Sequence, residues 1–126
     1  MLDRIDIHID VPRVDYEKLS DRRFGENSRS VRDRVELARE RQTQRFVESE
    51  LSCNADMHPS QVRTFCVLDE TCNNLMRSAM NQFQFSARAY HRILKLARTI
   101  ADLANSDTIT PTHLAEALQY RPRQIY

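Results

Sequence analysis

Residues 86–103 read SARAYHRILKLARTIADL. Ser86 is a favourable N-cap residue, and apolar side chains recur after it at helical spacing. The apolar residues of this stripe are Tyr90, Ile93, Leu94, Ala97, Ile100, Ala101 and Ala104. Leu96 and Leu103 lie off the stripe, so a second surface of the helix is expected to be covered too. The stretch predicts one long helix that packs on more than one side.

Three further helix starts are marked by a capping residue or by a proline at the first helical position. They are Pro59, Asp69 and Thr110–Pro111. After Asp69, apolar residues fall at i, i+3, i+4, i+7, i+8 and i+11, which is an amphipathic helix pattern: Cys72, Leu75, Met76, Ala79, Met80 and Phe83. The last helix is predicted to run through Gln119.

One more helix is predicted upstream, at roughly 31–48. Ser30 stands three residues before Asp33 and resembles a capping box, and apolar residues follow at helical spacing. Four or five helices with short links predict an all-α fold, a small antiparallel helical bundle spanning residues 31–126.

The first residues, 1–12, have a different pattern. They read MLDRIDIHIDVP, in which aliphatic and polar side chains alternate up to Pro12. This period of two predicts a β-strand or extended arm. No second strand of similar quality follows, so the strand is an orphan that either pairs with another chain or belongs to a sheet cut away upstream. We favour the second interpretation. Residues 13–30 are polar and are predicted to be a linker.

Composition excludes several classes of protein. The chain has one glycine, Gly25, whereas phosphate-cradling loops need several, so no P-loop or dinucleotide motif is present. Three cysteines at irregular spacings predict neither a disulfide framework nor a metal site. The sequence has no run of 18 apolar residues and no basic leader segment, which predicts a cytoplasmic protein without a membrane span.

Basic residues are unevenly distributed. Residues 13–45 carry ten Lys or Arg against seven acids, although the net charge of the chain is +1. A solvated, ion-paired helix face is the simpler interpretation, and a helical nucleic-acid-binding module is the alternative. A protein-interaction module whose exposed strand adds to a partner's sheet is a third possibility.

Two arginines occupy unusual places. Arg88 lies in the first turn of the long predicted helix, where a cation is mildly unfavourable unless an anion is close. Arg4 lies at the start of the predicted strand between two aspartates. Each is either a surface residue with an acidic neighbour or a cation that contacts a transferring phosphoryl group. Spacing alone does not decide between these roles.

Six segments together resemble the magnesium-chelatase-like AAA+ ATPases, including the ComM-like (competence protein) group. They are LDRIDIHIDVP, GENSRSVRDRVELARERQTQRF, NADM, FCVLD, SARAYHRILKLARTIADL and HLAEALQYR. The resemblance covers nearly the whole chain. It implies that residues 1–12 are the last strand of an AAA+ core and that residues 31–126 are the helical lid domain. The core, with its phosphate loop and Mg²⁺-binding acids, would precede Met1, so the chain is expected to be a C-terminal piece of a longer protein.

The resemblance also assigns roles. Arg4 matches the arginine finger, which reaches ATP bound by a neighbouring subunit, and Arg88 matches the sensor 2 arginine, which contacts the γ-phosphate within its own subunit. The longer protein is expected to bind ATP and Mg²⁺, whereas this piece is expected to hold no cofactor or metal and to be inactive alone. Its expected partners are its own missing core, further copies in a homo-oligomeric ring, and DNA. The SARAYHRILK block favours a bacterial DNA-remodelling or branch-migrating helicase over a tetrapyrrole metal-insertion enzyme.

Overall fold

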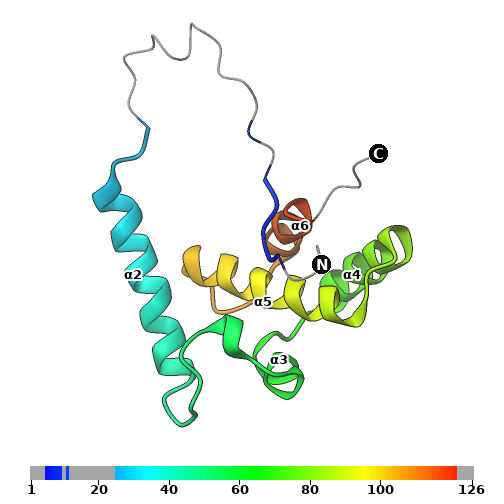
Figure 1. Cartoon of the computed structure of the whole chain (residues 1–126), viewed down its shortest axis with the longest axis horizontal. Helices are drawn as coiled ribbons and strands as arrows, with labels where there is room; N and C mark the ends of the chain where they lie inside the picture. The colour runs from blue at the N-terminus through cyan, green and yellow to red at the C-terminus, as the bar shows by residue number, and fades with distance from the viewer. Residues whose placement is uncertain (1–4, 10, 12–24, 122–126) are drawn as a thin grey trace, which may run out of the picture.

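The computed structural model of the chain describes residues 5–9, 11 and 25–121. This part is helical, with five α-helices and one short 3-10 helix, and it contains no strand (Figure 1). The elements are α2 (Ser28–Arg45), η2 (Asn54–Asp56), α3 (Pro59–Phe65), α4 (Glu70–Phe83), α5 (Ala87–Leu103) and α6 (Pro111–Gln119). The predicted all-α class is confirmed for these residues.

Helix α5 is the centre of the fold. It contacts α2, η2, α3 and α6, and α4 packs on α6. Figure 1 shows α2 running across the direction of α5 at one end of the body, with η2 and α3 along another side. Leu94, Ala97 and Ala101 of α5 are buried, and Leu96 and Ile100 are partly buried against the same core. The expectation that this helix is covered on more than one surface is therefore confirmed.

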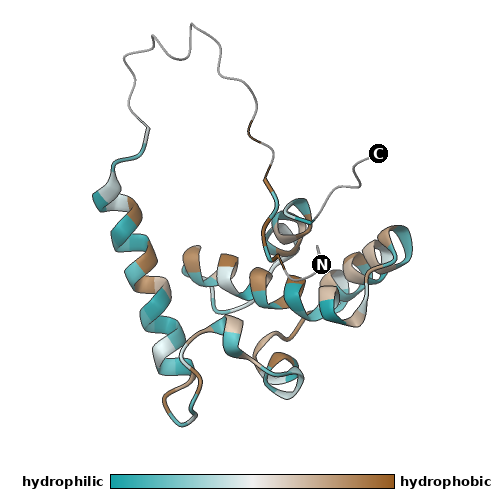
Figure 2. Cartoon of the chain, viewed as in Figure 1, coloured by the Kyte–Doolittle hydropathy of each residue, from teal (hydrophilic) through white to brown (hydrophobic). Residues whose placement is uncertain are grey.

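Apolar burial follows the predicted stripes. Figure 2 shows hydrophobic residues along the inner sides of α4, α5 and α6, whereas α2 is largely hydrophilic. The fully buried positions include Cys72 of α4 and Leu114 of α6, both with 0% exposure. Val62 of α3 and Phe46 after α2 complete the same core. One contiguous core therefore joins α3, α4, α5 and α6, and the chain after α2 enters it through Phe46.

Side-chain caps begin three of the helices at the predicted residues. Asp69 Oδ1 accepts a hydrogen bond from the Cys72 amide at 2.8 Å. Ser86 Oγ accepts from the Ala89 amide at 3.1 Å, and Thr110 caps α6, which ends at Gln119. These bonds satisfy amides that have no partner within their own helix. The predicted starts of α4, α5 and α6 are confirmed.

The predicted boundaries of α2 are wrong. The helix was expected at roughly 31–48 with Ser30 as its cap, but it spans Ser28–Arg45 and so begins inside the predicted linker 13–30. Asn27 is the cap, because its side chain accepts from the Ser30 amide at 2.8 Å. At the other end Phe46 is buried against Phe65, with ring centroids 5.4 Å apart. That contact turns the chain into the core and ends the helix.

The predicted strand does not form among the described residues of the first twelve, which are 5–9 and 11. We call residues 5–9 the N-terminal arm. The arm lies against the helical body, where the His8 amide donates to the Tyr120 carbonyl at 2.8 Å. A strand needs a ladder partner, and the described part of the chain offers none. Arg4, with the rest of residues 1–4, and most of the predicted linker lie outside the described residues.

Gln84→Gly is expected to stabilise the domain. Gln84, at the C-cap of α4, has φ of 51°, in the left-handed region that disfavours a side chain. Glycine removes that cost of roughly 1–2 kcal/mol and adds some unfolded-chain entropy, for a net gain of about 0.5–1 kcal/mol. Urea unfolding followed by circular dichroism measures it. Gln82→Gly, within α4, should instead destabilise by roughly 0.5 kcal/mol, and equal shifts in both variants would contradict this account.

Candidate functional site

Arg88 lies where the sequence places it, in the first turn of α5, and its side chain is exposed. It lines one cavity of about 570 Å³. The other lining residues are Asp6, Ile7, Ala55, Met57, His58, Pro59, His91, Arg92, Lys95, Leu96 and Thr99. We call this cavity the basic groove. One wall is α5, the opposite wall is the segment from η2 to the start of α3, and the N-terminal arm crosses it.

The basic groove concentrates positive charge. Arg88, Arg92 and Lys95 are basic residues on one side of α5, and Asp6 is the only carboxylate among the described residues of the lining. Lys95 Nζ donates to the Ala55 carbonyl at 3.2 Å, which holds this cation across the groove toward η2. A concave site with several cations facing one carboxylate favours anionic ligands.

The N-terminal arm is bound to the groove through Arg92. Arg92 Nε lies 2.7 Å from Asp6 Oδ1, and its Nη1 is 3.5 Å from the Ile5 carbonyl. The arm's aliphatic side chains are only partly covered, since Ile7 lines the groove yet is 47% exposed and Ile9 is 66% exposed. Polar contacts hold the arm, and much of its apolar surface remains exposed.

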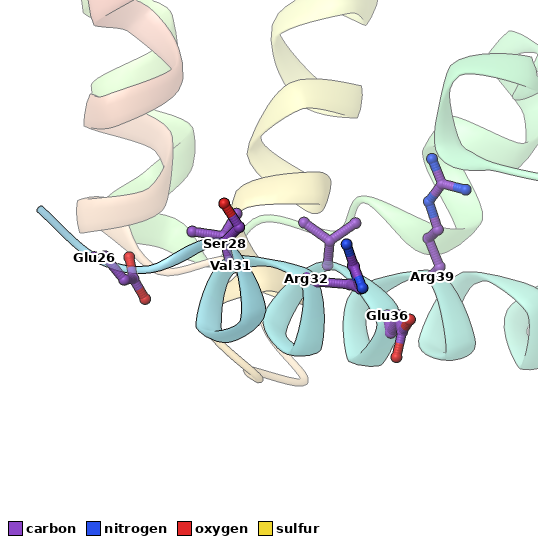
Figure 3. Close-up of a pocket in the computed structure, with 7 residues that line it drawn as sticks. Glu26, Ser28, Val31, Arg32, Glu36 and Arg39 are labelled. Carbon is purple, nitrogen blue, oxygen red and sulfur yellow. The ribbon is translucent and has the colours of Figure 1, made fainter.

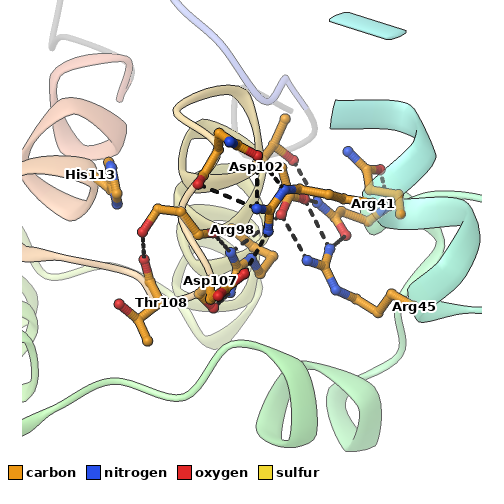
Figure 4. Close-up of polar contacts among 12 residues, drawn as sticks. Arg41, Arg45, Arg98, Asp102, Asp107, Thr108 and His113 are labelled. Carbon is orange, nitrogen blue, oxygen red and sulfur yellow. Dashed lines mark hydrogen bonds and ion pairs between the residues drawn. The ribbon is translucent and has the colours of Figure 1, made fainter. Parts of the chain in front are cut away.

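A polar cluster fixes α5 to α2 and η2 behind the groove (Figure 4). Asp102 of α5 is 1% exposed, and its two carboxylate oxygens accept from Arg45 Nη2 at 2.7 Å and Nη1 at 2.9 Å. Asn54 of η2 joins them by donating to Asp102 Oδ2 at 2.9 Å and accepting from Arg45 at 2.8 Å. Its amide nitrogen also donates to Thr99 Oγ1 at 3.0 Å. This fork-to-fork arrangement fixes the mutual position of the three elements.

Arg98 extends the polar cluster to the loop before α6. Its Nη2 lies 3.2 Å from Asp102 Oδ1, and its two Nη atoms donate to the Ser106 and Asp107 carbonyls at 2.8 and 3.0 Å. Burial lowers the pKa of Arg98, and the adjacent Asp102 carboxylate opposes that shift. Arg98 stays charged, because a guanidinium keeps its proton in proteins. Its role is therefore to bind the loop carbonyls.

The arginine-rich segment is partly occupied by internal contacts. Arg34 forms an ion pair with Glu26 at 2.7 Å. Arg41 binds the Asn105 side chain and pairs with Asp107 at 2.8 Å, which lowers the pKa of that carboxyl. A second hollow of about 450 Å³ runs along α2 (Figure 3), and the described residues that line it come from α2 and Glu26 and mix both charges. These contacts favour the interpretation of an ion-paired helix face.

The remaining chemistry-bearing residues do not assemble into a second site within the described ranges. There, no three His, Cys, Asp or Glu side chains come together to hold a metal ion. Burial raises the pKa of the Cys66 thiol to about 11, so it stays protonated at neutral pH. His113 accepts a hydrogen bond from the Thr110 amide at 3.1 Å and so takes part in the cap of α6. No helix in the described part is long and apolar enough to cross a membrane.

Sequence reasoning missed the polar cluster and the groove's opposite wall. Asn54, in the segment between α2 and α3, has no helix or strand pattern around it in the sequence, yet it is buried and contacts two helices. Arg98 and Asp102 stand four residues apart among the apolar residues of α5. This opposite-charge pair inside an apolar stripe was the signal that could have indicated a buried polar cluster. Charged side chains are rarely buried unless they are paired.

Comparison of the sequence with known proteins identifies its family. The family model described as "Magnesium chelatase, subunit ChlI C-terminal" matches residues 25–121. Competence protein ComM of Haemophilus influenzae is 41% identical over 123 residues, which cover 95% of this chain and 23% of that protein. The uncharacterised protein YifB of Escherichia coli K12 is 39% identical over 121 residues, covering 95% and 23%.

A more distant relative is the uncharacterised protein Rv2897c of Mycobacterium tuberculosis H37Rv. It is 30% identical over 121 residues, which are 96% of this chain and 24% of that protein. The chain thus spans about a quarter of the length of the curated relatives it matches. With most of its length inside the family match, the chain belongs to the magnesium chelatase ChlI C-terminal family and is similar to the C-terminal domain of ComM-like proteins.

Proposed function

We propose that the chain is the lid domain of a ring-forming AAA+ ATPase of the ComM-like type, and that Arg88 serves as its sensor 2 arginine. The observation that carries the proposal is the position of Arg88. It is exposed on the first turn of α5 at the rim of a groove with two further basic residues. Guanidinium groups so placed suit the charge that spreads over phosphate oxygens during phosphoryl transfer.

In this proposal the lid closes over ATP held by the AAA+ core of the same subunit. Arg88 then contacts the γ-phosphate, and hydrolysis removes that contact and lets the lid reopen. The polar cluster holds α5 against α2 and η2, so movement at Arg88 carries the helical body with it. The Mg²⁺ that accompanies ATP would neutralise phosphate charge, and acids of the core would hold it.

The proposed partners follow from the same arrangement. The N-terminal arm, with its exposed alternating isoleucines, would continue the core as the last strand of its sheet. Arg4 just before it would act as the arginine finger toward a neighbouring subunit of a homo-oligomeric ring. DNA remodelling or branch migration is proposed as the work of the whole protein. Its support is the similarity to a protein named for competence.

An isolated nucleic-acid-binding module is the weaker alternative. Arg34, Arg41 and Arg45 of the basic segment form ion pairs within the chain. Fewer arginines therefore remain for a phosphate backbone than the sequence count implies.

The isolated 126-residue chain is expected to show no ATPase activity, because one glycine cannot build a phosphate loop. Phosphate release from ATP and Mg²⁺, measured with and without DNA, tests this. The full-length protein, assayed in parallel, is expected to hydrolyse ATP. Turnover by the pure chain, or its absence from the full-length protein, would contradict the proposed function.

A further inference from the structure

Arg92 is a largely enclosed cation of the basic groove, with a side chain 15% exposed. It stands one helical turn after Arg88 on α5, and residues four apart on a helix lie on the same face. The two guanidinium groups therefore share the groove, and Lys95 follows them within the same lining. Arg88 is at the rim and Arg92 is farther inside.

Asp6 occupies the position an external anion would take at Arg92. Its Oδ1 lies 2.7 Å from Arg92 Nε, and it is the only acid among the described residues that line the groove. The carboxylate is attached to the arm and its side chain is 60% exposed. An ion pair this open to water is weak, so a multiply charged anion can replace it.

We propose that Arg92 is a second phosphate-binding side chain of the groove and that Asp6 is its built-in competitor. The ligand class is a chain of linked phosphates, which carries several negative charges and can contact more than one of Arg88, Arg92 and Lys95. A guanidinium can bind two phosphate oxygens at once, whereas Asp6 engages it through one. Identifying these phosphates as those of ATP rests on the proposed function.

The competition couples phosphate binding to the position of the arm. When phosphate binds Arg92, the ion pair between Arg92 and Asp6 is lost. The hydrogen bond from the His8 amide to the Tyr120 carbonyl then remains to hold the arm. By linkage, phosphate binding weakens the docking of the arm on α5 by the same factor as arm docking weakens phosphate binding. Anything that draws the arm away from α5 therefore raises the phosphate affinity of the groove. Asp6 thus makes the groove sensitive to where residues 5–9 lie.

Titration of the 126-residue chain with inorganic pyrophosphate, followed by calorimetry and by the Arg92 Nε–H nuclear magnetic resonance signal, tests the proposal. Arg92→Gln is expected to bind about tenfold more weakly, because it loses a charge-assisted bond. Asp6→Asn is expected to bind about two- to fivefold more tightly, since it removes a weak ion pair. Matched controls are Arg77→Gln and Asp33→Asn, at exposed helical positions outside the groove lining, and neither should change affinity.

A further variant separates this proposal from the proposed function. If Arg88→Gln weakens binding and Arg92→Gln does not, Arg92 is not a phosphate ligand, while the assignment of Arg88 stands. If Asp6→Asn binds no better than wild type, or if neither protein binds pyrophosphate, the competitor role is overturned. A short oligothymidylate titrated in parallel distinguishes the phosphate source. Binding of the oligonucleotide alone would overturn the assignment to a free phosphate chain.

Discussion

Asp102→Ala is expected to lower the free energy of unfolding by about 3–5 kcal/mol, because it leaves buried arginines without their counter-ion. Arg45 and Arg98 both form ion pairs with the Asp102 carboxylate, and the Asp102 side chain is fully buried. Asn54 loses an acceptor at the same time. Urea unfolding of the 126-residue chain measures the loss, and Asp102→Asn, which keeps the shape without the charge, should lie between wild type and Asp102→Ala.

Asp107→Ala is the matched control for this prediction. Asp107 also pairs with an arginine of α2, but its side chain is 90% exposed, so the pair should contribute little. Adding Arg45→Met to Asp102→Ala should recover part of the free energy of unfolding, because it removes one buried arginine that has lost its counter-ion. If Asp102→Ala costs no more than Asp107→Ala, the polar cluster is not what joins α2, η2 and α5.

Arg88→Ala in the full-length protein is expected to lower kcat for ATP hydrolysis by about a hundredfold or more. Removing one preorganised donor from developing phosphoryl charge typically has an effect of this size. The KM for ATP should change less, because the contact strengthens as hydrolysis proceeds. Steady-state ATPase kinetics provide the measurement.

Arg77→Ala is the control for Arg88→Ala. Arg77 is an exposed arginine of α4 and does not line the groove. Its removal should leave kcat unchanged, and the melting temperatures of both variants should match that of wild type. Equal kcat values for Arg88→Ala and wild type would remove the sensor role from Arg88.

The local starts of helices were predictable from single residues. Asp69, Ser86 and Thr110 each have a side-chain oxygen that caps the following turn, and a cap acts over three residues of sequence. The start of α2 was missed because Asn27 and Ser30 are both good caps in the same short stretch. Only the burial of Phe46, a tertiary contact, fixes where that helix ends.

The candidate site was only half predictable. Arg88 was identifiable because a cation in a first helical turn needs an explanation. The other wall of the groove was not, since Ala55 and His58 reach α5 through the fold rather than through spacing. Asn54 was missed for the same reason, because its partners Arg45 and Asp102 are 9 and 48 residues away in sequence. The strand stays a prediction, because a period of two indicates an extended conformation but supplies no partner, and residues 5–9 and 11 form no strand in the described part of the chain.

A structure of the full-length protein with a non-hydrolysable ATP analogue tests the central claim most directly. The account predicts that the Arg88 guanidinium lies about 2.7–2.9 Å from a γ-phosphate oxygen of the nucleotide bound by its own subunit. An Arg88 side chain directed into solvent, with the helical body turned away from the nucleotide, would contradict it.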